Sequence, residues 1–184
     1  MAVIRVGGHL GAGKSTLSKR LAKHYDYAYF YAGGIFREMA QGSGLTIEEF
    51  YEQLSANPEL EKSIDARQEQ LMVDRDNLIV EGRIAAFLRC SFAKVNIFIK
   101  ASEDESIRRL MKRPETQGRS FREVEKLLRK RVQLERERYL ALYGITDHLD
   151  ERKYDIVIDA TQLNPDELFR EAIRQIDGYL KKPE

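Results

Sequence analysis

Short apolar runs alternate with longer amphipathic stretches along the 184 residues of the chain. A short apolar run bounded by turn residues is typical of a buried strand, whereas apolar residues spaced three and four apart are typical of a helix. The runs that predict strands are Ala2–Val6, Tyr27–Tyr31, Asn77–Glu81, Lys94–Ile99 and Asp155–Ile158. Strands that alternate with helices predict a five-stranded parallel sheet covered by helices on both faces, an α/β fold.

Helix starts between these strands carry recognisable capping patterns. A hydroxyl residue followed three positions later by glutamate is a capping box, and an asparagine before proline joins a cap residue to a favourable first helical position. The capping boxes are Thr46-x-x-Glu49, Ser102-x-x-Glu105 and Ser120-x-x-Glu123, and the asparagine–proline pairs are Asn57-Pro58 and Asn164-Pro165. These patterns support helices in the segments that separate the strands.

Two segments are longer than the sheet needs. We expect a single domain over residues 1–184, because a chain of this length supports one core and not two sizeable ones. Ligands of such sheets bind at the carboxyl ends of the strands, where both extra segments would emerge. The predicted core is 1–41, 73–112 and 154–184, with a helical acceptor-binding insertion at about 42–72 and a lid with flanking helices at about 113–153.

Charge and composition limit the kinds of partner that the protein could bind. The chain has 31 Lys and Arg against 30 Asp and Glu, so its net charge of +1 gives no general attraction to nucleic acid. No apolar run approaches the roughly 20 residues that span a bilayer. One cysteine excludes an internal disulfide, and the first strand leaves no room for a signal peptide. We expect a cytoplasmic monomer that binds neither nucleic acid nor membranes.

The segment from Gly7 to Thr16 contains a complete P-loop, Gly8-x4-Gly13-Lys14-Ser15, between a predicted strand and a predicted helix. Glycines let the backbone N–H groups surround phosphates, the lysine reaches the β- and γ-phosphates, and the serine hydroxyl ligates Mg²⁺. The candidate ATP-binding residues in this loop are Gly8, Gly11, Ala12, Gly13, Lys14, Ser15 and Thr16.

A carboxylate beside a P-loop can hold Mg²⁺ through water. Glu81 ends the apolar run Asn77–Glu81, and Asp159 ends the run Ile156–Asp159. We favour Glu81, because the third strand usually neighbours the first in this architecture, with Asp159 as the alternative.

Arginines in two places predict a second phosphate site. Arg37 and Arg83 follow the second and third predicted strands, and a guanidinium binds a phosphate monoester through two hydrogen bonds. Arg131 and Arg138 lie seven positions apart on one helical face, with Glu135 on the same side. Arginines carried by a closing lid would stabilise the moving phosphoryl group and exclude water. The three histidines show no metal-binding spacing.

Together these motifs resemble the nucleoside monophosphate kinases, most closely the short archaeal-type cytidylate kinases. The resemblance covers nearly the whole chain. Its markers are the P-loop, Ala32-Gly-Gly-Ile-Phe-Arg37, Ile64-Asp-Ala-Arg-Gln68, Val80-Glu-Gly-Arg83 and the segment from Arg131 to Ile145. The resemblance implies a P-loop NTPase three-layer sandwich, and Mg²⁺-dependent, reversible transfer of the ATP γ-phosphate to CMP or dCMP.

The resemblance also implies roles for single residues. Lys14, Arg83, Arg131 and Arg138 would be catalytic, with Lys14 on the migrating phosphoryl group and both lid arginines above it. Arg37 and Arg83 would clamp the acceptor phosphate, while Asp65 and Arg67 would face the cytosine edge. The acceptor site would also include Gly33, Glu135 and Arg138. Apart from the resemblance, Arg109 and the stretch Ala160-Thr161 are candidate neighbours of the donor adenine, with Arg109 counted among the ATP-binding residues.

Some positions depart from the family pattern, and two other functions remain open. Gly34 and Val132 stand where relatives often carry acidic residues, which affects the preferred base more than the reaction, and His9-Leu10 replaces a small or proline pair. One alternative is a kinase of another small acceptor, such as adenylate, shikimate or dephospho-coenzyme A. The other is a nucleotide-gated binding protein or assembly factor, for which a second phosphate site has no purpose.

Overall fold

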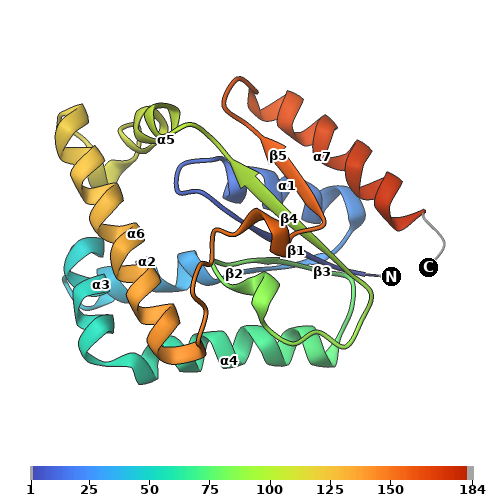
Figure 1. Ribbon diagram of the computed structural model, residues 1–184, viewed down its shortest axis with the longest axis horizontal. Coiled ribbons are helices and arrows are strands. Elements are labelled where there is room, and N and C mark those ends of the chain that lie inside the picture. The colour runs from blue at the N-terminus through green and yellow to red at the C-terminus, as the bar shows by residue number, and fades with distance from the viewer. Residues whose placement is uncertain (1, 182–184) are drawn as a thin grey trace.

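The computed structural model describes residues 2–181 and contains one five-stranded sheet in which every pairing is parallel, in the order β2-β3-β1-β4-β5 (Figure 1). The strands are β1 (Val3–Gly8), β2 (Ala28–Tyr31), β3 (Leu78–Glu81), β4 (Lys94–Lys100) and β5 (Ile156–Asp159). The predicted α/β fold and parallel sheet are confirmed, and β3 lies beside β1 as expected.

The helices begin and end close to the predicted signals. They are α1 (Lys14–Tyr25), α2 (Ala32–Gly42), α3 (Ile47–Ala56), α4 (Pro58–Asp74), α5 (Glu103–Leu110), α6 (Phe121–Tyr143) and α7 (Pro165–Leu180), with short 3-10 turns at Ala85–Phe87, Pro114–Thr116 and Glu151–Lys153. Complete capping boxes form at Thr46, Ser120 and Asn164. Ser102 accepts the Glu105 N–H, whereas the Asn57 side chain makes no cap hydrogen bond.

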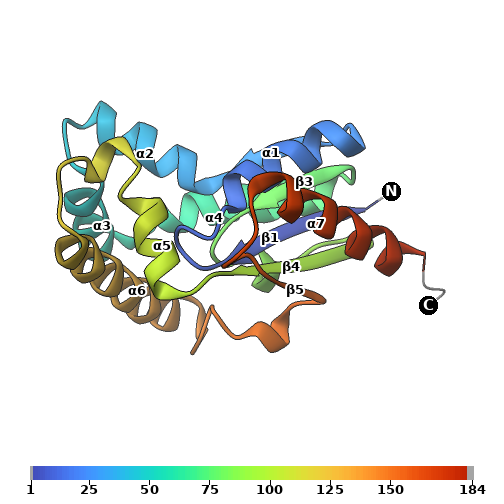
Figure 2. The same ribbon diagram turned by 90° about the horizontal axis from the view of Figure 1, so that it is seen from above.

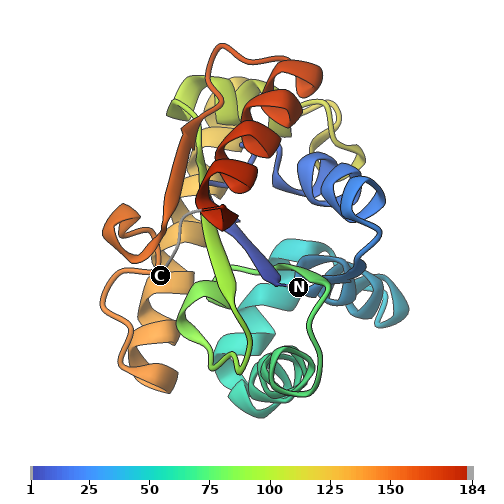
Figure 3. The same cartoon turned by 90° about the vertical axis from the view of Figure 1, so that its right-hand side faces the viewer.

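The strands bury both faces because their side chains alternate between two clusters of apolar residues. Ile4 and Ile79 pack under α1 and α7, while their neighbours Val3, Leu78 and Val80 pack on the side of α4. Figure 3 shows α1 and α7 on one side of the sheet and α4 on the other. No helix within residues 2–181 is long and apolar enough to cross a membrane.

Three helices extend past the carboxyl ends of the strands. There α2, α3 and α6 form one end of the molecule, beyond the P-loop that connects β1 to α1 (Figures 1 and 2). Helices α3 and α4 occupy most of the predicted insertion, and α6 occupies most of the predicted lid region. How these parts move relative to the core stays a prediction.

Candidate active site

The P-loop folds around its own lysine. Gly8, Gly11 and Gly13 have positive φ angles of 121°, 75° and 97°, which side chains rarely tolerate. The Lys14 Nζ donates to the carbonyl oxygens of Gly8 and His9 at 2.9 and 2.5 Å. Burial, together with the nearby Arg83 guanidinium, lowers the pKa of Lys14 well below its usual value. A phosphate group would therefore relieve an environment that disfavours the lysine charge.

Glu81 ends β3 directly beside the first turn of α1. Its Oε1 accepts from the Ser15 Oγ at 2.7 Å, and its Oε2 accepts from the Tyr29 hydroxyl at 2.5 Å. Burial and the adjacent carboxylate raise the pKa of Tyr29, so Tyr29 acts as a donor. Asp159 lies on the edge strand, where it is exposed and accepts from Thr161. The geometry thus supports Glu81, and not Asp159, as the carboxylate beside the P-loop.

Four arginines from separate elements converge on the same cleft, and two glutamates hold them in pairs. Glu135 of α6 binds the Arg83 Nε at 3.2 Å and the Arg131 Nε at 3.0 Å. Glu115 lies 3.5 Å from the Arg37 Nε and 3.7 Å from an Arg113 terminal nitrogen. The arrangement concentrates positive charge in the cleft, and the two carboxylates hold the arginine side chains in place.

Glu135 is the more deeply buried of these carboxylates, with its side chain 1% exposed. Burial alone would raise its pKa, but Arg83 and Arg131 hold the pKa well below the usual range. His148, which is equally buried, places its Nε2 3.4 Å from the Glu135 Oε2. Glu135 is therefore ionised and surrounded by cationic and polar partners.

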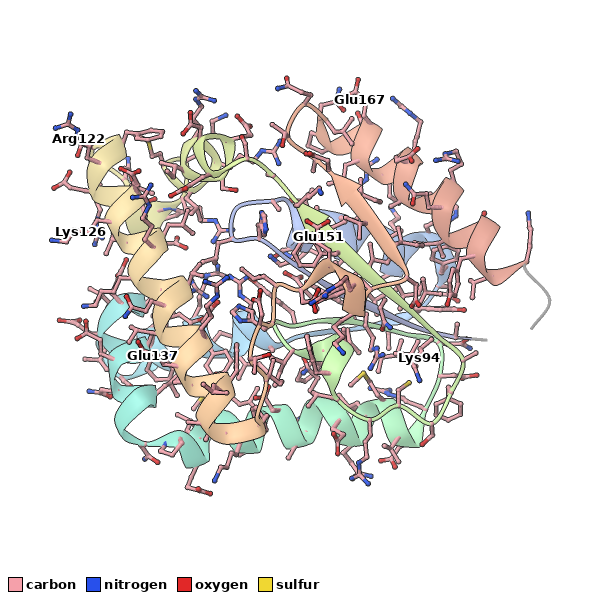
Figure 4. All side chains as sticks on the ribbon, in the orientation of Figure 1. Lys94, Arg122, Lys126, Glu137, Glu151 and Glu167 are labelled. Atoms are coloured by element: carbon pink, nitrogen blue, oxygen red, sulfur yellow. The ribbon has the colours of Figure 1, made fainter. Side chains whose placement is uncertain are left out.

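The cleft joins these arginines to the P-loop. Its lining includes the loop residues Leu10, Gly11, Gly13, Lys14, Ser15 and Thr16, the arginines Arg37, Arg83, Arg113 and Arg131, the acids Asp65, Glu81 and Glu135, and Tyr31, Ala32, Gly33, Phe36, Tyr51, Gly82 and Tyr139. Nitrogen atoms gather between α6 and the sheet, while Arg122 and Lys126 point outward from α6 (Figure 4). One cleft thus combines a P-loop with a second set of cations.

Asp65 of α4 is a further acidic residue in the lining of the cleft. Its carboxylate accepts from the Tyr143 hydroxyl at 2.9 Å. Burial raises the pKa of Asp65 to about 7, which the Tyr143 hydrogen bond opposes and the nearby Glu61 reinforces. A buried carboxyl that is held by one donor still has acceptor capacity for a ligand.

Known proteins with similar sequences are cytidylate kinases. One from Methanopyrus kandleri is 35% identical over 98% of this chain and 95% of its own, and one from Thermococcus kodakarensis is 38% identical over 91% of this chain and 83% of its own. The chain belongs to the cytidylate kinase family. The predicted resemblance and the prediction of a P-loop nucleoside monophosphate kinase are confirmed at this level. A family model described as an AAA domain also matches residues 4–130 of the kinase.

Solved structures support the fold of this kinase. Shikimate kinase from Bacteroides thetaiotaomicron matches with a TM-score of 0.61 and 18% identity, covering 98% of this chain and 99% of that one. Shikimate kinase from Aquifex aeolicus matches with a TM-score of 0.60 and 16% identity, covering 97% and 98%. At such low identity the match establishes a shared fold and does not identify the substrate.

Several residues expected in the site do not line the cleft of the kinase. The Arg138 Nε donates to Glu61 of α4 at 2.7 Å, and the pair is buried away from the cleft lining. Arg67 lies on the exposed side of α4, because it is two residues after the inward-facing Asp65. Ala12 is fully buried and takes part through its carbonyl, which accepts from Arg109 at 3.3 Å.

A second hollow adjoins the other side of the P-loop in the kinase. Arg109 lines this hollow and donates to the carbonyl oxygens of Ala160 and Leu163 at 2.7 and 3.3 Å. The residues around it are Gly11, Gly13, Thr16, Leu17, Glu105, Arg109, Lys112, Arg113, Leu163, Asn164, Pro165 and Leu168. Arg109 therefore organises the backbone at this hollow, where we expected the donor base.

Sequence reasoning missed Arg113, which lines the cleft, and Glu115, which pairs with Arg37 and Arg113. Both lie in the charged turn Lys112-Arg-Pro-Glu115, which follows β4 and α5. The charges of this turn, in a segment that follows a predicted strand, were the sequence feature that could have pointed to them. Burial lowers the pKa of Arg113, and the Arg37 guanidinium, which shares Glu115 with it, lowers this pKa further. Val132, which stands where relatives often carry an acidic residue, packs with Leu128 in an apolar cluster and does not line the cleft.

Proposed function

We propose that this member of the cytidylate kinase family transfers the γ-phosphate of ATP reversibly to CMP or dCMP as a cytoplasmic monomer. The observation that carries this proposal is the cleft in which Lys14 and the P-loop meet four arginines. A nucleotide-gated switch needs one phosphate site, whereas phosphoryl transfer between two nucleotides needs two facing ones. The cytidylate kinase names of the relatives support CMP as the acceptor.

The chain provides positioning and charge for this reaction. Lys14 and the P-loop N–H groups would hold the donor phosphates, while Arg37 and Arg83 would clamp the acceptor phosphate. An oxygen of that phosphate forms the new bond to the γ-phosphorus as the bond from this phosphorus to the β–γ bridging oxygen breaks. Arg131 and Arg113 would neutralise the charge that spreads over the moving group. A phosphate nucleophile needs little general-base help.

The residues beside the P-loop suit Mg²⁺. Ser15 and Glu81 present oxygen atoms, which this hard cation prefers, and no group of three His, Cys, Asp or Glu side chains suited to a metal occurs within residues 2–181. Ser15 would ligate Mg²⁺ directly, and Glu81 would hold it through water. When bound, Mg²⁺ would neutralise charge on the donor phosphates.

A coupled assay of ADP release tests the proposal. ATP and Mg²⁺ are supplied with CMP, dCMP, UMP, AMP, shikimate, dephospho-coenzyme A or no acceptor. We expect CMP-dependent turnover far above the rate without acceptor, and loss of that turnover in Lys14→Met. Lys19→Met is the matched control, because Lys19 is an exposed lysine on the same helix. Preference for another acceptor, or turnover that needs none, would contradict the proposal.

A further inference from the structure

Gln68 is a fully buried side chain of α4 whose amide lacks a protein partner. Its relative exposure is 0%, and neither its Oε1 nor its Nε2 has a hydrogen-bond partner among residues 2–181. A buried amide left unpaired is costly, and an apolar residue of the same size would suit a purely structural position better. The amide therefore keeps its full hydrogen-bonding capacity.

The amide lies beside the cleft that contains the arginines. A Cβ atom added to Gly82, a cleft-lining residue, would lie 2.3 Å from the Gln68 Oε1, so the amide sits directly against this glycine and a side chain there would displace it. Gln68 is also three residues after Asp65, which places both side chains on the same face of α4. Asp65 itself lines the cleft and is oriented by the Tyr143 hydroxyl.

The two side chains offer a carboxylate acceptor next to an amide donor. Cytosine presents the complementary pair on its edge, an exocyclic amino donor beside the N3 acceptor, whereas uracil presents a carbonyl acceptor beside an N3–H donor. Uracil would set its O4 carbonyl against the Asp65 carboxylate, two acceptors with no donor between them, and the Gln68 amide would have to turn over in its buried site to accept from the N3–H. The pair therefore favours cytosine over uracil.

We propose that Gln68 is a specificity-determining residue that donates from Nε2 to N3 of the acceptor cytosine, while Asp65 accepts from its amino group. This proposal rests on the proposed CMP kinase function and deepens it. It replaces Arg67, which faces away from the cleft, with the neighbouring residue of the same motif.

The test combines a change in the enzyme with a change in the substrate. We would measure kcat/KM at pH 8 for CMP, UMP and 3-deaza-CMP, in which a C–H group replaces N3, with wild type and Gln68→Met. Wild type should lose roughly 10- to 100-fold on 3-deaza-CMP relative to CMP, because the buried Gln68 donor would be left without a partner. Gln68→Met should show a similar loss on CMP, a smaller CMP preference over UMP, and no further loss on 3-deaza-CMP.

Two controls separate the possible failures. Gln70→Met changes an exposed glutamine two residues along α4 and should leave all three values and the KM for ATP unchanged. If wild type uses 3-deaza-CMP as well as CMP, Gln68 does not read N3, even if Gln68→Met fails to fold. If wild type does not phosphorylate CMP, the proposed function itself is wrong. If wild type prefers CMP and Gln68→Met keeps the same CMP/UMP ratio, only the Gln68 assignment is wrong.

Discussion

Replacing Asp65 with asparagine should stabilise the folded protein, and the gain should grow as the pH rises. Burial raises the pKa of Asp65 from 3.8 to about 7, against the opposing Tyr143 hydrogen bond. Between about pH 4 and pH 7 the folded state therefore binds more protons than the unfolded state, and the free energy of unfolding falls with rising pH. Asparagine keeps an oxygen for Tyr143 and removes this ionisation.

The size of the effect follows from the shift of about three pKa units. Linkage turns that shift into a cost of about 2 kcal/mol at pH 5, where the side chain is ionised in the unfolded state and protonated in the folded state, and of about 4 kcal/mol at pH 8, where it is ionised in both. The difference in unfolding free energy between Asp65→Asn and wild type should therefore widen by about 2 to 3 kcal/mol over this range.

Urea unfolding without nucleotides, at pH 5, 6.5 and 8, measures this difference. Asp74→Asn is the control, because it removes the same charge from an exposed position on the same helix. Its difference from wild type should stay constant across these pH values. A gap for Asp65→Asn that is equally constant would refute the argument that burial controls the ionisation of Asp65.

The remaining predictions concern α6. Arg131→Met should lower kcat by roughly 100- to 1,000-fold, since it removes a cation from the cleft. Arg138→Met should mainly lower the unfolding free energy, by about 3 to 5 kcal/mol, because Glu61 would be left buried without its partner. Steady-state kinetics and urea unfolding of both variants test these roles, and exchanged effects would reject them. Glu135→Gln should lower kcat by roughly 10- to 100-fold by releasing Arg83 and Arg131. The exposed Glu137→Gln should leave kcat unchanged, and equal effects would show that Glu135 has no positioning role.

Local patterns predicted the elements well, because their causes are local. The five strands follow from apolar runs, and the capping boxes at Thr46 and Ser120 form as their spacing indicates. Glu81 was placed beside the P-loop correctly because strand order follows a general rule of parallel sheets.

Helical periodicity could not tell which partner each helical face meets. Arg131 and Arg138 do share one side of α6, but the first reaches the cleft and the second, two turns later, reaches Glu61 of α4. Arg67 and Gln68 belong to one motif, yet only the three-dimensional packing shows that the glutamine is buried and unpaired. Such distinctions depend on contacts between distant segments, which one sequence does not reveal.

The arginines of the cleft and the Asp65–Gln68 pair differ in how their polar groups are partnered. Around the phosphate positions four arginines share the two carboxylates of Glu115 and Glu135, so their positive charge is compensated only in part before any phosphate binds. Asp65 has no such cation within hydrogen-bond reach, and Gln68 has no partner at all among residues 2–181. Neutral or apolar side chains at these two positions would give a higher free energy of unfolding. Their presence is consistent with selection for the base that they would bind, at the expense of folding free energy.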